Sequence, residues 1–99
     1  MNKQELAQKM QENQAWVPGK TVKLDFGEQG VIFLDGAAEK VTEEDSAADT
    51  TIKMAWDDWQ KMAAGELDGM TAFMTGKLKI EGDMSNAMQL QGVLAKLRG

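Results

Sequence analysis

Few side chains of this sequence are suited to bond chemistry, because it contains neither cysteine nor histidine. Their absence excludes thiolate nucleophiles, conventional zinc sites and histidine-dependent triads. The two serines, Ser46 and Ser85, lie in no nucleophile-elbow pattern. Asp57 and Asp58 are adjacent, and side chains one position apart on a helix point about 100° away from each other. This pair is therefore unsuited to acid–base catalysis, and the sequence predicts no catalytic residue.

The densest acidic cluster, residues 43–49, is the remaining candidate for a metal site. A calcium loop needs oxygen ligands at alternate positions around a central glycine, and this segment lacks that pattern. We therefore interpret it as a solvated loop. The sequence predicts no metal, no cofactor and no enzymatic activity.

Composition limits the partners of the chain. Its 99 residues allow one domain, over 1–99, and its net charge of −5 with no basic run makes nucleic acid an unsuitable partner. No apolar stretch is long enough to span a membrane, and the polar start lacks the apolar segment of a signal peptide. We therefore expect a cytoplasmic location.

Methionine is unusually concentrated in one part of the chain. Six of the eight methionines lie between residues 54 and 88. Methionine is unbranched and polarizable, so it fills irregular gaps in cores and also lines surfaces that accept varied apolar shapes. Composition alone leaves both interpretations open.

Hydrophobic periodicity predicts the elements that position these side chains. In chain order they are a helix over 2–14, strands over 22–26, 31–34, 38–43 and 48–54, helices over 56–65 and 68–74, a strand over 77–80, and a helix that begins after Asp83. Asn2, Asp68 and Asp83 are the expected N-caps. The first four strands have no helix between them, which favours meander order in an antiparallel sheet.

The last helix has more apolar surface than one sheet face requires. One stripe consists of Met84, Ala87, Met88 and Gln91, and an overlapping one of Leu90, Val93, Leu94 and Leu97. A helix that packs on a sheet needs an apolar face of about 100°, and these stripes together cover more than half of the circumference. The excess must contact another helix, another chain or a ligand.

Residues 66–91 resemble the signature of the sterol carrier protein 2 family. The matching runs are Ala72-Phe73, Gly76-Lys77-Leu78-Lys79-Ile80, Gly82-Asp83-Met84 and Ala87-Met88-Gln89-Leu90-Gln91. Upstream, residues 48–52 and the Asp58-Trp59 pair resemble the family's fourth strand and following helix, although phenylalanine is more usual at position 59. The resemblance covers the whole chain, weakly before Ala48 and strongly after it.

The resemblance implies an α+β fold, with a five-stranded, mainly antiparallel sheet covered on one side by helices and an apolar tunnel between them. It implies that Met84, Met88 and Leu94 line the tunnel, and that the amide of Gln91 meets a ligand head group. The further lining candidates are Phe33, Trp59, Met70, Phe73 and Met74, each equally consistent with plain core. Asn86 stands where the family usually has an apolar residue, so it either polarises one wall or faces water.

The family binds or transfers fatty acids, fatty acyl-CoA, sterols or other isoprenoid lipids, so the resemblance implies a lipid carrier with transient membrane contact. A second hypothesis is an accessory module that presents lipid to a biosynthetic complex, such as ubiquinone assembly. A third is a structural domain without a cavity, whose spare helix face packs on a second chain. The sequence leaves the physiological lipid and the oligomeric state open.

Overall fold

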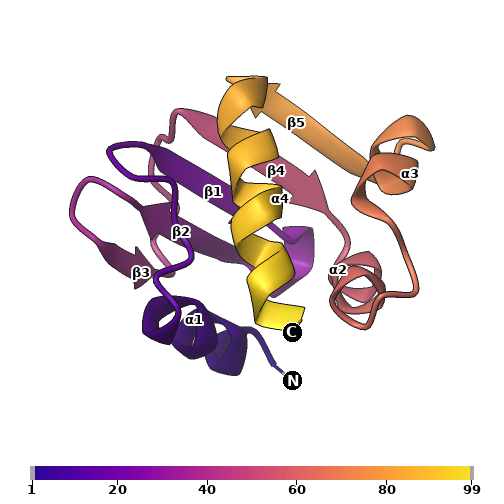
Figure 1. Cartoon of the computed structure of the whole chain (residues 1–99), viewed down its shortest axis with the longest axis horizontal. Coiled ribbons are helices and arrows are strands. Elements are labelled where there is room, and N and C mark those ends of the chain that lie inside the picture. The colour runs from indigo at the N-terminus through magenta and orange to yellow at the C-terminus, as the bar shows by residue number, and fades with distance from the viewer. Residues whose placement is uncertain (1, 99) are drawn as a thin grey trace.

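The computed structural model describes the backbone of residues 2–98, and the side chains of these residues except those of residues 63 and 94–98. Its elements are α1 (Lys3–Glu12), β1 (Thr21–Asp25), the 3₁₀ turn η1 (Gly27–Gln29), β2 (Val31–Asp35), β3 (Lys40–Thr42), β4 (Thr50–Met54), α2 (Trp56–Ala63), α3 (Gly69–Met74), β5 (Leu78–Gly82) and α4 (Met84–Arg98) (Figure 1). Every helix and strand that the sequence predicts is confirmed, with bounds shifted by a few residues.

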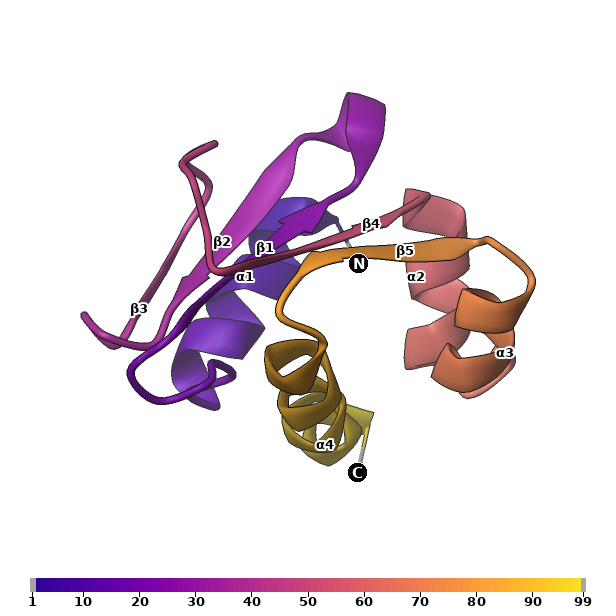
Figure 2. The same cartoon turned by 90° about the horizontal axis from the view of Figure 1, so that it is seen from above.

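The five strands form one mixed sheet in the order β3-β2-β1-β4-β5. Three of the neighbouring pairs are antiparallel, and the central pair of β1 with β4 is parallel. All four helices lie on one side of this sheet (Figure 2). The α+β class and the five-stranded, mainly antiparallel sheet are therefore confirmed.

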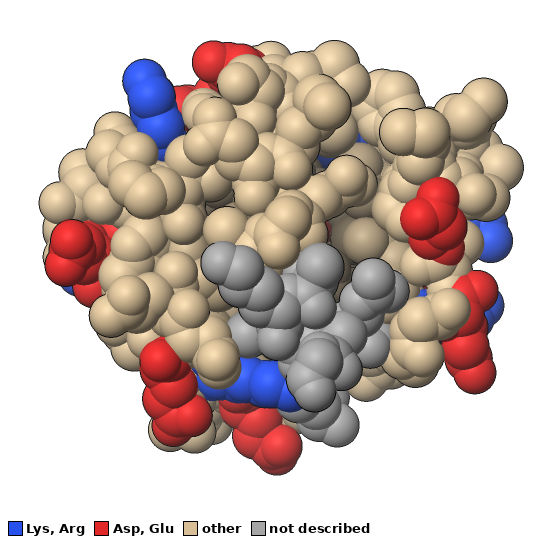
Figure 3. All heavy atoms as spheres, viewed as in Figure 1, with Lys and Arg blue, Asp and Glu red and all other residues tan. Residues whose placement is uncertain are grey.

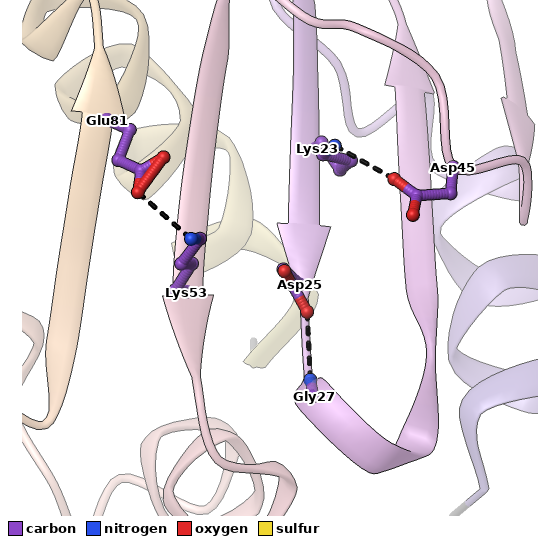
Figure 4. Close-up of polar contacts among 6 residues, drawn as sticks. All are labelled: Lys23, Asp25, Gly27, Asp45, Lys53 and Glu81. Carbon is purple, nitrogen blue, oxygen red and sulfur yellow. Dashed lines mark hydrogen bonds and ion pairs between the residues drawn. The ribbon is translucent and has the colours of Figure 1, made fainter.

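The expected meander order is wrong for the fourth strand. β4 pairs with β1 rather than with β3, so Thr50 lies beside Val22 and Ile52 beside Leu24. Residues 43–49 link β3 to β4, and the 2.9 Å ion pair of Lys23 with Asp45 holds this segment against the sheet (Figure 4). Hydrophobic alternation identifies a strand and its buried face, but it does not specify the neighbouring strand.

The two faces of the sheet have different environments. The face beneath the helices carries Val22, Leu24, Ile32 and Leu34, which are buried completely or nearly so and pack with residues of α1. Burying each such side chain contributes about 1.5–3 kcal/mol. Phe33 points to the opposite face, where its register neighbours are Lys23 and Thr42. The continuous apolar run of β2 is thus buried on both faces.

The start of α1 follows the predicted capping pattern. The Asn2 Oδ1 accepts a 2.8 Å hydrogen bond from the Glu5 backbone N–H, which satisfies one of the unpaired donors at the helix N-terminus. Leu6 and Met10, one turn apart, are both buried against the sheet. This half of the molecule is therefore built as a conventional packed core.

Candidate functional site

Among the described residues, large apolar side chains are exposed on two helices, α3 and α4. Met70, Phe73 and Met74 lie on α3, and Met84 and Met88 lie on the first two turns of α4. Met74 exposes 78% of its surface and Met88 exposes 69%. All five are among the residues that the sequence predicts to line a ligand site.

α3 presents its apolar residues because its N-terminus is fixed. The Asp68 carboxylate accepts a 3.2 Å hydrogen bond from the Thr71 backbone N–H, which confirms the predicted cap. Ala72 is fully buried, so the helix has one packed face. Met70 and Met74 are one turn apart, and both project away from the core.

α4 begins at a turn that requires glycine. Gly82 has a φ of +93°, and a Cβ at this position would clash with the Asp49 carbonyl oxygen. The Asp83 Oδ1 then accepts a 2.9 Å hydrogen bond from the Ser85 backbone N–H, which confirms the third predicted cap. The direction of α4 away from β5 is therefore determined by residues 82–85.

A buried polar pair fixes the first turns of α4 on the sheet. The Thr50 hydroxyl donates to the Asp83 carbonyl oxygen over 2.7 Å, and the Asn86 Nδ2 donates to the Thr50 Oγ1 over 3.1 Å. Thr50 is 0% and Asn86 3% exposed. Asn86 therefore meets β4 rather than solvent.

This orientation of α4 buries Ala87 of the first predicted stripe and leaves the rest of that stripe exposed. Asn86, Ala87 and Leu90 are buried, whereas Met84, Met88 and Gln91 form an exposed stripe at positions i, i+4 and i+7. The side chain of Leu94 lies outside the described residues. The excess apolar surface predicted for this helix is thus present along the described part of its exposed stripe.

The side chain of Gln91, on the exposed stripe of α4, reaches Gly69 on α3. A Cβ built on Gly69 would stand 2.6 Å from the Gln91 Nε2 and 3.5 Å from the Met62 Cε, so α2, α3 and α4 meet at this glycine. Because Met88 and Gln91 share one face of α4, Met88 also faces the side of α4 on which α3 lies. Figure 3 shows that this side of the molecule is hollowed beside α4 and has uncharged atoms at its centre. We give one name, the methionine face, to the exposed side chains of α3 and α4 together with Gln91, namely Met70, Phe73, Met74, Met84, Met88 and Gln91.

The core beneath the methionine face is apolar. Its buried members from α2, α3, β5 and α4 are Trp59, Ala72, Leu78, Ala87 and Leu90. The ring of Trp59 meets that of Phe26 edge-on, with centroids 5.6 Å apart. Trp59 therefore lies deeper than the methionines, and Phe33 lies apart from all of them on the other side of the sheet.

A crevice of about 450 Å³ lies elsewhere, between α1 and β3. Its lining is mostly amide and carboxylate groups: Gln4, Ala7, Gln8, Gln11, Glu12, Val41, Thr42 and Glu43. The Gln11 Oε1 accepts a 2.8 Å hydrogen bond from the Val41 backbone N–H, which covers the free edge of β3. This polar lining does not suit an alkyl chain.

Charged groups on the sheet are paired on the side opposite the methionine face. Lys53 and Glu81 form a 2.9 Å ion pair (Figure 4). The hydrogen bond to Glu81 and the charge of that carboxylate raise the pKa of Lys53 above its usual value of 10.5. Among the described residues, no group of acidic side chains has the arrangement of a metal site. No described helix is long and apolar enough to cross a membrane.

Comparison with known proteins identifies this architecture. The model of the SCP-2 sterol transfer family matches residues 2–95. Hydroxysteroid dehydrogenase-like protein 2 of Mus musculus is 40% identical over 72 residues, which are 69% of this chain and 15% of that protein. The chain spans a fifth or less of the length of the first curated relatives that it matches.

Two solved structures share the fold. Sterol carrier protein 2 of Aedes aegypti, determined in complex with palmitate, superposes with a TM-score of 0.75 at 20% identity over 92% of both chains. A ubiquinone synthesis protein, UbiJ-SCP2, superposes with a TM-score of 0.67 at 17% identity over 97% of this chain and 94% of that one. At these identities the similarity establishes the fold.

Proposed function

Because this chain belongs to the SCP-2 sterol transfer family, we propose that it binds an apolar lipid between its sheet and α3–α4 and carries it without bond chemistry. The observation on which this proposal rests is the methionine face, where five large apolar side chains are exposed above an apolar core. A small domain has little stability to spare for such exposure. Exposed apolar patches mark ligand-binding or interaction sites, and a bound ligand would cover these side chains.

The proposed site is built from residues of α2, α3 and α4. Met70, Phe73 and Met74 contribute from α3, Met84 and Met88 from α4, and Trp59 lies at the base. Gln91 supplies the polar group that meets a head group. Leu94 follows Gln91 on α4 and stays a sequence-based candidate. Phe33 is left out, because it lies on the opposite face of the sheet.

The ligand class follows from the lining. Methionine accepts varied apolar shapes, so a fatty acid, a fatty acyl-CoA or an isoprenoid or sterol-like lipid is suitable. The palmitate complex of the Aedes aegypti protein supports a fatty acyl chain as the first ligand to test. In this proposal the bound chain occupies an apolar tunnel that opens between α3 and α4.

The proposed mechanism is partition between water, membrane and protein. Burying a 16-carbon chain contributes about 12 kcal/mol at about 0.8 kcal/mol per methylene. Association and ordering cost about 4–15 kcal/mol, and a cost at the low end of that range leaves about 8 kcal/mol, which corresponds to a dissociation constant of about 1 μM. A bilayer offers the chain a similar gain, so exchange requires only transient membrane contact in the cytoplasm.

One variant pair tests the site. Met88→Glu places a charge among the exposed methionines, and Gln89→Glu places the same charge one position along α4, on another side of the helix. We expect Met88→Glu to abolish uptake of a fluorescent fatty acid, and Gln89→Glu to bind like the unaltered protein. Far-ultraviolet circular dichroism checks that both variants are folded. Equal binding by the two variants would remove the methionine face from the site.

The lipid itself is identified by native mass spectrometry of protein purified from cells. We expect a complex whose added mass matches an extractable lipid. A bare monomer would contradict the carrier proposal. A lipid-free dimer that Met88→Glu dissociates would instead show that a second copy covers the methionine face.

The similarity to UbiJ-SCP2 favours one second candidate, an accessory module that presents lipid to a biosynthetic complex. The same site serves both functions, because each requires a lipid to be held and released. Affinity capture followed by lipid extraction distinguishes them. A lipid recovered together with stoichiometric enzyme subunits supports the module, and a lipid recovered alone supports the carrier.

A further inference from the structure

Gly69, the first residue of α3, lacks a side chain for a reason that its backbone conformation does not explain. Positive φ angles occur at six other glycines, and Gly69 is not among them. Its surroundings supply the reason, since a Cβ there would lie 2.6 Å from the Gln91 Nε2. Heavy atoms in proteins do not approach a Cβ this closely, so any other residue at position 69 would displace the Gln91 amide.

We propose that the amide of Gln91, resting on the bare Cα of Gly69, is a latch that closes one end of the opening between α3 and α4. This inference rests on the proposed function and adds a residue pair that controls entry and release. The latch joins two helices whose exposed methionines would otherwise flank a continuous opening. Gly69 acts as a positioning residue, because it sets where Gln91 lies.

Two properties make this contact suitable for a gate. Gln91 is exposed, so its side chain can rotate away without disturbing buried groups. The first turns of α4 are fixed by the hydrogen bonds of Thr50 with Asp83 and Asn86, so their position does not depend on the latch. The opening between α3 and α4 can therefore widen or narrow while the fold is maintained. Ligand exchange would then need only local motion.

Met62 gives the latch a second readout that needs no ligand. Its Cε would lie 3.5 Å from a Cβ on Gly69, an ordinary contact distance, so Met62 and Gln91 lie against the same glycine. Met62 is partly buried, whereas Met70, Met74 and Met88 are exposed. Methionine sulfur oxidises faster where peroxide can reach it. If Gln91 shields Met62, as the latch requires, then displacing Gln91 should raise the oxidation rate of Met62 relative to the exposed methionines.

The decisive variant is Gly69→Ala, and Gly92→Ala on α4 is its matched control. Both put alanine at a helical glycine, but a Cβ at Gly92 meets no atom within 4 Å. At Gly69 the nearest atom is the end of a flexible side chain, so the variant should fold. We expect Gly69→Ala to release a fluorescent fatty acid at least about fivefold faster, equivalent to about 1 kcal/mol, and Gly92→Ala to release it no faster than the unaltered protein.

Gln91→Ala and the double variant complete the test. Gln91→Ala should also accelerate release, and Gly69→Ala combined with it should add nothing, because both changes remove one contact. The latch would be refuted if the two substitutions raised the release rate independently, so that their factors multiplied in the double variant. It would also be refuted if Gly69→Ala left the release rate unchanged. If the unaltered protein binds no fatty acid, the proposed function fails. Peroxide oxidation, followed by peptide mass spectrometry, still tests the latch in that case: equal Met62 rates in Gly69→Ala and Gly92→Ala would refute it.

Discussion

The described methionines of this protein include two groups with opposite environments. Met10 on α1 is 0% exposed, and Met54 at the end of β4 is 6% exposed. Met74 and Met88 expose 78% and 69% of their surfaces on α3 and α4. The same residue type is a core filler in one region and forms the methionine face in the other.

This contrast shows that local packing, rather than composition, decides what a methionine does. Around Met10, helix α1 and the sheet face each other directly, and Leu6, Leu24 and Leu34 complete the core. On α3 and α4, the packed faces are taken by small residues, Ala72 and Ala87, and by Leu90. The methionines of these two helices therefore lie outside the core, where a ligand can reach them.

The largest expected effect is a change in stability, which distinguishes the buried methionines from the exposed ones. Met10→Ala removes a fully buried side chain and should lower the free energy of unfolding by about 2–5 kcal/mol. Met88→Ala, the same change on the methionine face, should alter it by less than about 0.5 kcal/mol. Urea unfolding followed by tryptophan fluorescence measures both. A large loss for Met88→Ala would mean that the methionine face is part of the packed core.

The next effect tests the contrast by ligand binding. Palmitate at about one hundred times its dissociation constant should stabilise the folded protein by about 2.7 kcal/mol. The gain should be the same for Met10→Ala, because Met10 lies away from the proposed site, and absent for Met88→Glu. Thermal unfolding with and without palmitate gives these differences. An equal gain for Met88→Glu would place the ligand elsewhere.

The sequence predicts most of this arrangement because most of its signals are local. The caps Asn2, Asp68 and Asp83 each act within three residues, and each forms the predicted hydrogen bond. The excess apolar surface of the last helix is visible in its own periodicity. That periodicity predicts that the helix has more apolar surface than one packed face can bury, and that Met84 and Met88 are part of the excess.

The features that could not be predicted depend on contacts between distant residues. The position of Asn86 is set by Thr50, 36 residues earlier, through the pairing of β4 with β1. A meander order would place β4 beside β3 and therefore does not allow the pairing of β4 with β1. The reason for glycine at position 69 lies in Gln91, on another helix. Neither partner leaves a pattern in the local sequence.

A smaller effect tests how α4 is held on the sheet. Asn86→Ala removes the donor to the Thr50 hydroxyl in a buried site and should cost about 1–3 kcal/mol. Gln89→Ala, an exposed change on the same helix, should cost less than about 0.5 kcal/mol. Chemical denaturation compares the two variants. Equal stabilities would show that the polar pair does not fix α4.

The smallest effect belongs to the ion pair of Lys53 with Glu81, on the face of the sheet away from the helices. The side chains are 46% and 61% exposed, so solvent screens their attraction. Because the hydrogen bond to Glu81 raises the pKa of Lys53 above its unfolded value of 10.5, the stabilisation is complete below pH 10.5 and is lost as the pH rises through the folded pKa.

Glu81→Gln should therefore bring the pKa of Lys53 back toward 10.5, which an NMR titration of the lysine Cε resonance measures. It should also weaken the dependence of stability on pH above 10 while leaving fatty acid affinity unchanged, because neither residue touches the methionine face. A change in affinity would mean that the two faces of the sheet are coupled. The division of this molecule into a packed sheet and an accessible helical layer would then not hold.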